Sequence, residues 1–574
     1  MPGHSYDANP CHPPVGGTVA VGWDVGVDGL PGGRCTLAID GPAALAWNEV
    51  ADAVAGRLHA AGRPVRVCDV RDQYVPWAVF LDRTPGGDLN DDPDFARLST
   101  AGVDALFDGR PAAPVPEPGG VTVVHGPGSA LVEHDVLWYV DLPKRFAESG
   151  LGSLAARDLG ARTQDPPATS RRLFYVDWPV LDRHRDGLLP HVDRWFDVQG
   201  ERGDPADAVD RVTSVSGTVL RDSAARLAHR PFRTRPVFNT TPWGGHWAQR
   251  ELGMSPDAEN TALGYELIAP ESGVLLGSPA GPTVEIPFAA VVVLFPVQLL
   301  GPRVHETFGT SFPIRFDYLD TSGGGNLSVH CHPQSDYMRK VFGWPYTQHE
   351  TYYVVYTAPE RKVYLGLRAN TDIEEFRARA HDADTAGTPV DIEQFVQTFP
   401  ARLHQLFLIP AGTPHSSGEG NVVLEVSATP YLYSLRFYDW LRRGSTGSRR
   451  PVHVEHAFAN LDSARRGQAV GRDLVGAPQV LRAGPGWSEE LLGALPEMFY
   501  EVYRLRLHGG VAPCDTNGRF RVMTVVDGAG VVLTGPDGPR ELSYAETLVV
   551  PAAVGRFSVE ARGGPAMVVT AVVR

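Results

Sequence analysis

The chain is poor in cysteine and lacks the cysteine pairs on which a disulfide framework depends. Its 574 residues include only five cysteines, which is an odd number. They are scattered along the chain with no Cys-x-x-Cys pair, at positions 11, 35, 68, 331 and 514. Few and isolated thiols are typical of proteins in a reducing compartment. We therefore expect a cytoplasmic protein without structural disulfides.

Long apolar runs and basic clusters are missing as well. The longest apolar run, FAAVVVLFPVQLL, is too short to cross a bilayer and contains Pro296. The N-terminal stretch MPGHSYDANPCHPPVGG has no apolar core and so does not resemble a signal peptide. The formal net charge is −15, whereas nucleic-acid binding needs a basic surface. We expect neither a membrane nor a nucleic-acid partner. The expected ligand is a small molecule, and a homodimer is an open alternative to a monomer.

The texture of the sequence changes along the chain, which is too long for a single core. Up to about residue 200, apolar strands such as CTLAID alternate with helical patterns such as NEVADAVAGRLHAAG, in which Val50, Val54 and Leu58 recur at helical spacing. Alternating strands and helices predict an α/β domain with a parallel sheet. We assign residues 17–200 to this domain, 1–16 to a disordered tail, and the polar stretch 201–235 to a connector.

From about residue 236 the sequence predicts β structure. Short strands such as TYYVVYTA and NVVLEVSA alternate with Gly/Pro turns, as in sandwiches and barrels. We assign residues 236–445 to a first β unit with a small helical insert at about 371–400. Residues 446–574 then form a linker and a second β unit. From about residue 496 this second unit contains a single histidine, His508, so we expect it to be free of metal.

A degenerate phosphate loop follows the strand CTLAID. The working pattern G-x-x-x-x-G-K-[ST] uses its glycines, lysine and hydroxyl to hold phosphates and Mg²⁺. Laid on this chain from Gly41, the pattern meets Ala46, Trp47 and Asn48 at the three chemical positions. The loop Gly41 to Asn48 is therefore expected to be inactive.

The surroundings of this loop resemble the uridine-kinase-like branch of P-loop kinases. The resemblance rests on AIDGPAA, GRPVRVCDVRDQYVPW and VVHGPGSALVEHDVLWYVDLP. It implies a P-loop-kinase-like fold, here a pseudokinase kept for packing or dimer contacts. An alternative also stays open: the domain still binds a nucleotide or a sugar, through Asp69, Asp72 or Tyr74.

The stretch NLSVHCHPQSDYM suggests a metal site. On a strand His330 and His332 point to the same face and Cys331 to the other. A His-x-His pair alone is a weak signal, but Glu350 precedes an aromatic strand and His415 follows the turn PAGTP. Three imidazoles and a carboxylate suit Zn, Fe, Mn or Ni. His-x-His, then Glu, then His is also the ligand order of the cupin barrel.

About 340 residues at the C-terminal end resemble type I mannose-6-phosphate isomerases, which are cupins. The matching segments occur in order: RPVFNTTPWGGHW, LGYEL, LSVHCHPQSDYM, TQHETYYVV, IPAGTPHSSGEGNVVLEV and YSLRFYDWLR. The resemblance implies a double-cupin (jelly-roll) fold for the C-terminal half. It implies one divalent ion, most simply Zn, with His332, Glu350 and His415 as ligands and His330 in place of a family Gln ligand.

The resemblance also implies a reaction, the interconversion of mannose 6-phosphate and fructose 6-phosphate by proton transfer through a cis-enediol. The family has a Lys shortly before its Glu ligand, where this chain has Gln348 and His349. Glu425 and His349 are the candidate bases. Arg436 matches an Arg suited to hold phosphate or developing negative charge. Arg436, Trp243 and Gln348 are the candidate substrate-binding residues.

Three alternatives stay open. Because the Lys is missing, the first alternative is an isomerase whose substrate is a different, unphosphorylated sugar. A non-catalytic protein that senses a sugar or a nucleotide would have the same fold, and a cupin oxygenase would use Fe in the site of three His and one Glu. Metal analysis separates the oxygenase, because it needs redox-active iron, and turnover separates the sensor.

Overall fold

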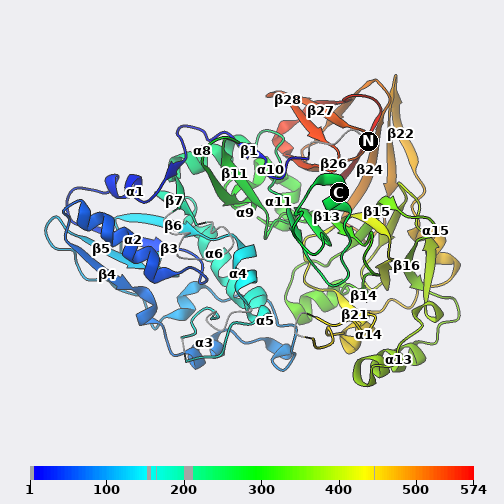
Figure 1. Ribbon diagram of the computed structural model, residues 1–574, viewed down its shortest axis with the longest axis horizontal. Helices are drawn as coiled ribbons and strands as arrows, with labels where there is room; N and C mark the ends of the chain where they lie inside the picture. The colour runs from blue at the N-terminus through cyan, green and yellow to red at the C-terminus, as the bar shows by residue number, and fades with distance from the viewer. Residues whose placement is uncertain (1–5, 152–156, 163, 199–210, 445–446) are drawn as a thin grey trace.

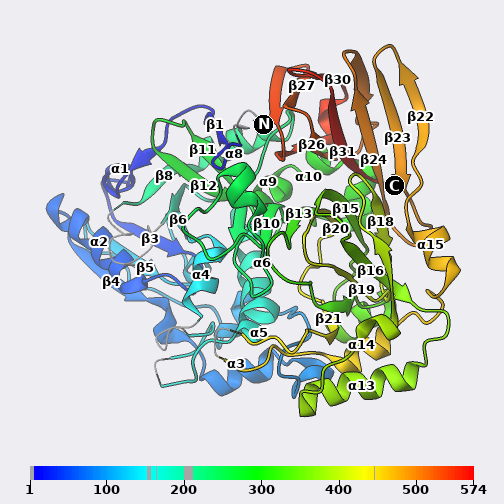
Figure 2. The ribbon, with the colours of Figure 1, turned by 45° about the vertical axis from the view of Figure 1, so that its right-hand side comes forward.

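The computed structural model describes residues 6–151, 157–162, 164–198, 211–444 and 447–574. An α/β domain occupies one side of the molecule, and the β-rich part, coloured green to red, occupies the other (Figure 1). Turning the molecule shows the second β unit, with β22 to β31, set against the upper end of the first (Figure 2). No helix in the described ranges combines the length and the apolar character that a membrane crossing requires.

The N-terminal domain is built on a seven-stranded sheet in the order β2-β8-β7-β6-β3-β5-β4. Five neighbouring strands, with β4 at the edge, run parallel: β3 (Cys35–Asp40), β4 (Val65–Asp69), β5 (Val121–His125), β6 (Val136–Asp141) and β7 (Arg194–Asp197). Beyond β7 the sheet continues with two antiparallel strands, β8 (Thr213–Ser216) and β2 (Ala20–Val21). The strands β3, β5 and β6 in the middle of this run are largely apolar and buried, as expected where helices cover both faces of a sheet.

The helices of this domain follow the predicted pattern. In α2 (Trp47–Ala60) the residues Val50, Val54 and Leu58 are buried, which is the apolar stripe of an amphipathic helix. Gly62 ends the segment with a φ of +72°, a conformation that glycine adopts without strain. Other helices of the domain are α1 (Asp24–Asp28), α3 (Trp77–Arg83), α4 (Lys144–Gly150), α5 (Ser170–Arg172), α6 (Trp178–Leu188) and α8 (Gly217–Leu227). The prediction of an α/β domain is confirmed.

Part of the expected connector belongs to the domain instead. Residues 213–216 form β8, which pairs with β7, and residues 217–227 form α8. Ser216 caps α8 by accepting a hydrogen bond from the amide of Val219, and Leu220 and Leu227 are buried. The polar, charged composition concealed a narrow apolar stripe. Residues 201–210 of the expected connector lie outside the described ranges.

The expected disordered tail is ordered from residue 6 onward, and residues 1–5 lie outside the described ranges. Strand β1 (Cys11–His12) pairs in parallel with β11 (Gly273–Gly277) of the β-rich part. The Nε2 atom of His12 lies 2.8 Å from the carbonyl oxygen of Arg233, and the hydroxyl of Tyr6 donates to the buried carboxylate of Glu266. Strand addition uses backbone groups that every residue but proline carries in full, so no pattern of side chains predicted it.

The first β unit consists of two facing sheets. The six-stranded sheet has the order β18-β15-β20-β13-β10-β9 and the five-stranded sheet the order β17-β16-β19-β14-β21. The first comprises β18 (Leu406–Ile409), β15 (Glu350–Thr357), β20 (Asn421–Ala428), β13 (Ile314–Asp320), β10 (Leu263–Leu267) and β9 (Val237–Asn239). The second comprises β17 (Val396–Pro400), β16 (Lys362–Leu367), β19 (His415–Ser417), β14 (Val329–Cys331) and β21 (Leu435–Tyr438).

Two helical segments interrupt the strands of the first β unit. The expected insert contains α13 (Ile373–Ala386), which packs Phe376 against Phe437 of β21 and Phe458 of α14 (Val454–Asn460). A second helical segment was not expected in a part predicted to be all β: α9 (Phe288–Leu294), α10 (Pro296–Leu300) and α11 (Pro302–Phe308). Pro296 and Pro302 each stand at the start of a helix, where a missing N–H costs nothing.

The second β unit also has two sheets, in the orders β22-β23-β24-β31-β26-β29 and β25-β30-β27-β28. The first comprises β22 (Gln479–Gly484), β23 (Trp487–Gly493), β24 (Tyr500–Leu507), β31 (Ala566–Val573), β26 (Arg521–Asp527) and β29 (Thr547–Val550). The second comprises β25 (Val511–Asp515), β30 (Arg556–Ala561), β27 (Gly530–Gly535) and β28 (Gly538–Ser543). Helix α15 (Gln468–Leu474) precedes them. The β-rich character predicted for the C-terminal half is confirmed.

A buried carboxylate joins the two halves of the molecule. Glu285 lies on β12 (Thr283–Pro287), which pairs with β11, and is 2% exposed. Arg145 of α4 binds both of its oxygens at 2.7 Å, and Arg235 binds one at 2.7 Å. The amide of Glu285 donates to Asp197, the last residue of β7, at 2.6 Å. One side chain thus ties the α/β domain to the β-rich part.

Replacing Glu285 with Gln should destabilise this junction. The change leaves two guanidinium groups facing a neutral amide, and breaking a buried ion pair in this way costs about 3–5 kcal/mol. We expect the earliest urea-induced transition to move to lower denaturant. Glu541→Gln is the matched control, because Glu541 pairs with Arg562 at the surface and is 65% exposed at its side chain. Equal effects of the two changes would contradict a junction held by Glu285.

Candidate metal centre

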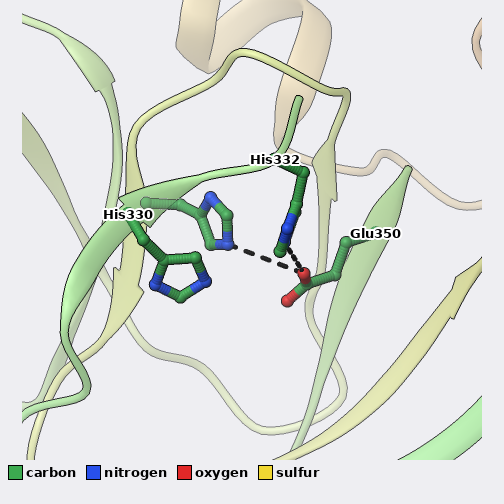
Figure 3. A group of neighbouring side chains, drawn as sticks. His330, His332 and Glu350 are labelled. Carbon is green, nitrogen blue, oxygen red and sulfur yellow. Dashed lines mark hydrogen bonds and ion pairs between the residues drawn. The ribbon is translucent and has the colours of Figure 1, made fainter. Parts of the chain in front are cut away.

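Four buried side chains converge between the two sheets of the first β unit: His330, His332, Glu350 and His415. One ligand atom from each lies within 4.8 Å of the ligand atoms of the others. His330 lies on β14 with His332 just after it, Glu350 opens β15, and His415 opens β19. His332 and Glu350 point toward one another from opposite sheets, with His330 beside them (Figure 3). The sequence predicted this convergence.

Strand geometry aims the histidines inward. His330 pairs directly with His415 across the antiparallel β14 and β19, so the two rings share a face and their centroids are 4.3 Å apart. Cys331 points outward, with its Sγ 3.6 Å from the carbonyl of Ala457 in α14. The alternation of a strand therefore places His330 and His332 together and Cys331 on the other side, as predicted.

A tight turn before β19 positions His415. Gly412 in PAGTP has a φ of +83°, and a Cβ added there would lie 2.6 Å from the carbonyl oxygen of Asn460. Only glycine fits such a close approach without displacing the backbone. The turn thus brings the chain against α14 and directs the next strand, with His415 at its start, into the barrel.

The backbone orients all three imidazoles in the same way. The Nδ1 atoms of His330, His332 and His415 lie 2.9, 3.2 and 2.9 Å from the carbonyl oxygens of Ser328, Tyr433 and Thr413. These contacts assign the proton to Nδ1 and leave the lone pair on Nε2, which is the form in which His ligates a metal. The Nε2 atom of His415 lies 3.6 Å from Oε2 of Glu350, and that of His332 contacts the same oxygen.

The electrostatics of the cluster favour neutral imidazoles around an ionised carboxylate. Burial lowers the pKa of His330 well below its ordinary value, and the nearby His415 and His332 lower it further. Burial likewise lowers the pKa of His332, outweighing the carboxylate beside it. Burial acts to raise the pKa of Glu350, but the surrounding imidazoles hold that pKa well below its ordinary value.

The residues present fit a divalent cation. Oε1 of Glu350 and Nε2 of His415 are buried and have no hydrogen-bond partner in the described part of the chain. Buried polar atoms without partners are costly unless an ion or water satisfies them. Three neutral imidazoles and one carboxylate are the donor set of Zn²⁺ and of other borderline divalent ions.

A charged group on the six-stranded sheet adjoins the cluster. Register places Arg315 opposite Ser427, which is opposite Glu350, and Asp317 opposite Glu425 in the next row. Arg315 donates from Nε to Ser427 at 2.6 Å and from Nη2 to the Glu425 carboxylate. The Ser427 hydroxyl also donates to Glu425, at 2.7 Å. The predicted base therefore lies within the barrel and is held by a guanidinium.

No role was predicted from the sequence for Arg315 and Asp317. Both are buried, at 6% and 1% exposure. The signal was present, because IRFDYLD places Arg315 and Asp317 two residues apart among apolar residues, before Asp320 ends the strand. Charged residues are almost never fully buried unless they are paired. Such a pair on an interior strand should have marked a polar site.

Gln348 and His349 take different positions beside the cluster. Nε2 of Gln348 donates to Oε2 of Glu350 at 3.1 Å, and its Oε1 is buried without a partner among the described residues. Nδ1 of His349 accepts the amide of Ala411 at 3.2 Å, and burial lowers the pKa of His349 to about 4. Gln348 thus offers a polar atom beside the ligands, whereas one nitrogen of His349 is already engaged by the backbone.

Arg436 pairs in register with His330, but its guanidinium donates to the carbonyl of Pro451 at 2.9 Å. Burial lowers its pKa to about 10, and the charges that act on it include Arg450, Asp439 and Asp94. Trp243 is 6% exposed and belongs to the apolar core. None of the contacts described for these two side chains reaches the four clustered residues.

Contacts within the domain engage the residues around the end of β3, where the sequence predicted a degenerate phosphate loop. Asp40 accepts the amides of Gly41 at 2.8 Å and Ala130 at 2.9 Å, and it lies 2.9 Å from Nε2 of His184. Trp47 is 1% exposed and stacks near His125. The carboxylate of Asp40 therefore accepts hydrogen bonds from backbone amides at the start of the predicted loop and in the turn after β5.

The other candidates in this domain are partly engaged as well. Asp69 binds Arg71 at 2.6 Å, and the hydroxyl of Tyr74 donates to the carbonyl of Pro127 at 2.7 Å. Asp72 lies in the short helical turn Val70–Gln73 that follows β4.

Comparisons with known proteins divide the chain in the same way. A family model described as "Domain of unknown function (DUF8485)" matches residues 22–228. The chain is 24% identical over 337 residues to the probable mannose-6-phosphate isomerase GmuF of Bacillus subtilis, covering 58% of this chain and 96% of that protein. It is 26% identical over 300 residues to a mannose-6-phosphate isomerase of Streptococcus mutans, covering 51% and 84%.

Among solved structures, the mannose 6-phosphate isomerase from Bacillus subtilis is similar, with a TM-score of 0.47 and 19% identity over 60% of this chain and 99% of that one. The kinase likeness of the N-terminal domain stays a prediction, since the model that matches there names no activity. The β-rich part is thus similar to mannose-6-phosphate isomerases over more than half of the chain, and the N-terminal domain matches the family DUF8485.

Proposed function

We propose that the protein is a metal-dependent aldose–ketose isomerase of a hexose or hexose phosphate. The observation that carries the proposal is the buried cluster of His330, His332, Glu350 and His415 beside the carboxylate of Glu425. Such an isomerase needs an electrophile for the carbonyl oxygen and a base that reaches C1 and C2. The likeness to mannose-6-phosphate isomerases supports the same reaction class.

The protein groups have separate roles in this proposal. His330, His332, Glu350 and His415 would hold one divalent ion, most simply Zn²⁺, which supplies a Lewis acid for the carbonyl and adjacent hydroxyl. Glu425 moves the proton between C1 and C2, so that the sugar passes through a cis-enediol. Burial raises the pKa of Glu425 well above its ordinary value, although Arg315 lowers it, and a raised pKa suits a base that works near neutral pH.

Two further groups would position the substrate and the base. Arg315 holds the carboxylate of Glu425 from one side, so the base has a fixed orientation. The unpartnered amide oxygen of Gln348 can accept a sugar hydroxyl beside the ligands. The substrates to test first are mannose 6-phosphate and fructose 6-phosphate, which the relatives' names suggest, followed by the free sugars.

For the N-terminal domain we propose a structural role without phosphoryl transfer. Asp40 occupies loop amides, and the buried ring of Trp47 stands where a P-loop has its lysine. The nucleotide phosphates would therefore meet a carboxylate instead of a cation.

The metal proposal predicts that His332→Ala loses most of the bound ion. Removing one of four ligands weakens binding, and zinc added to the purified chain should reach close to one equivalent only in the wild type. Elemental analysis after dialysis gives the measurement. His508→Ala, in the second β unit and exposed, is the control and should leave the metal content unchanged. Full occupancy in the His332 variant would overturn the assignment.

The mechanism predicts that product formed in deuterated water gains deuterium at the carbon that receives the proton. A hydride shift would instead retain the hydrogen of the substrate. Glu425→Gln should slow turnover about 10²–10⁴-fold if that carboxylate is the base, with metal content nearly unchanged. Glu419→Gln, on the exposed turn before β20, is the control. A filled metal site with no turnover of any sugar would favour the sensor.

The N-terminal proposal predicts no ATP hydrolysis by the full chain above the rate of a protein-free blank. The measurement is phosphate release with Mg²⁺ and ATP in excess. Steady release that disappears in Asp40→Asn would show that the loop after β3 is active after all.

A further inference from the structure

A polar band crosses the six-stranded sheet from the metal cluster toward the N-terminal domain. Register places Glu425 beside Asp317, and Asp317 beside Tyr265 on β10. The band ends near Glu271, in the turn after β10, which accepts a hydrogen bond from the hydroxyl of Tyr431. Helix α4 lies between the sheet of the N-terminal domain and this unit in both views (Figures 1 and 2).

The cation of this band is already compensated. Arg315 contacts the carboxylate of Glu425 and lies 3.9 Å from that of Asp317, so one guanidinium stands between two acidic side chains. Its Nε donor is taken by Ser427 at 2.6 Å. A phosphate ester brings nearly two negative charges and needs uncompensated donors, as a bidentate Arg or a Lys would supply.

Two other cations nearby are directed elsewhere. The guanidinium of Arg436, which the sequence assigned to phosphate, binds the carbonyl of Pro451. Lys144 on α4 binds Asp182 at 2.6 Å and lies over the ring of Trp178. Among the described residues, the cations of the band and of α4 named here therefore all have partners within the protein.

The outer end of the band is acidic. Burial raises the pKa of Glu271 to about 8, and the nearby carboxylate of Glu148 on α4 raises it too. Burial also raises the pKa of Glu148, to about 7. Carboxyl groups that exchange protons near neutral pH can both donate hydrogen bonds to sugar hydroxyls and accept them, whereas they repel a phosphate.

We propose that this site takes an unphosphorylated aldose or ketose, with Arg315 and Asp317 as the pair that excludes a phosphate ester. The inference rests on the proposed isomerase and narrows its substrate class. Specificity of this kind comes from the unfavourable contact with the wrong ligand as much as from the favourable contact with the right one.

The test compares mannose and fructose with their 6-phosphates on the zinc-loaded full chain. Binding is measured by titration calorimetry and turnover by kcat/KM. We expect kcat/KM for the free sugars to exceed that for the phosphates at least tenfold, and we expect inorganic phosphate not to compete with the free sugar. A preference for the phosphates, in binding or in turnover, would overturn the inference.

A charge variant tests the assigned pair. Asp317→Asn leaves Arg315 with one carboxylate and should narrow the preference for free sugar over sugar phosphate about tenfold. Asp336→Asn is the control, because Asp336 pairs with Arg339 at the surface and is 74% exposed at its side chain. If Asp317→Asn does not fold, competition by inorganic phosphate on the wild type decides, and strong competition would count against the inference.

The two proposals fail in different ways. Free sugar that binds without being converted would overturn the isomerase and uphold the ligand class. Turnover of the phosphates in preference would uphold the isomerase and overturn the ligand class. Binding of neither sugar to the metal-loaded chain would overturn both.

Discussion

The carboxylate of Glu350 is enclosed by three imidazoles at 1% exposure, and this constraint organises the first β unit. An ionised carboxylate in such a place is costly unless positive charge compensates it. Backbone carbonyls hold the three rings with Nε2 inward. The cluster therefore presents lone pairs, which attract a cation and repel a second anion. Both facing sheets must keep their register for this arrangement, because a slip of one residue would turn the side chains outward.

The α/β domain supports that geometry from outside. Glu285 joins α4 to β12, while Asp92 binds His456 of α14 at 2.8 Å and Phe95 packs on His453 with ring centroids 4.7 Å apart. Asp94, in the same region of the domain, acts on Arg436 of β21 through its negative charge. The N-terminal domain therefore packs on α14, which contacts the strand β14 that carries His330, and its helix α4 carries Glu148 near Glu271 at the outer end of the polar band.

Much of the fold and site could be predicted from periodicity and motif order. Strand alternation placed His330 and His332 together, and helical spacing gave α2 with Val50, Val54 and Leu58 buried. Composition misled where a polar segment carried a narrow apolar stripe, as in α8, and where the chain folds by backbone pairing, as in β1. Arg315 and Asp317 were overlooked because charged residues are usually taken as exposed.

The sequence by itself determined the change from an α/β to a β-rich part and the four side chains able to hold an ion, because periodicity and ligand chemistry are local properties. Only the tertiary structure decided what surrounds them. It paired Arg315 with Glu425 through strands β13 and β20, whose residues are 110 apart in the chain, and it turned Arg436 toward Pro451. Charge balance in a site depends on which side chains meet through space, and no local pattern in the sequence encodes that.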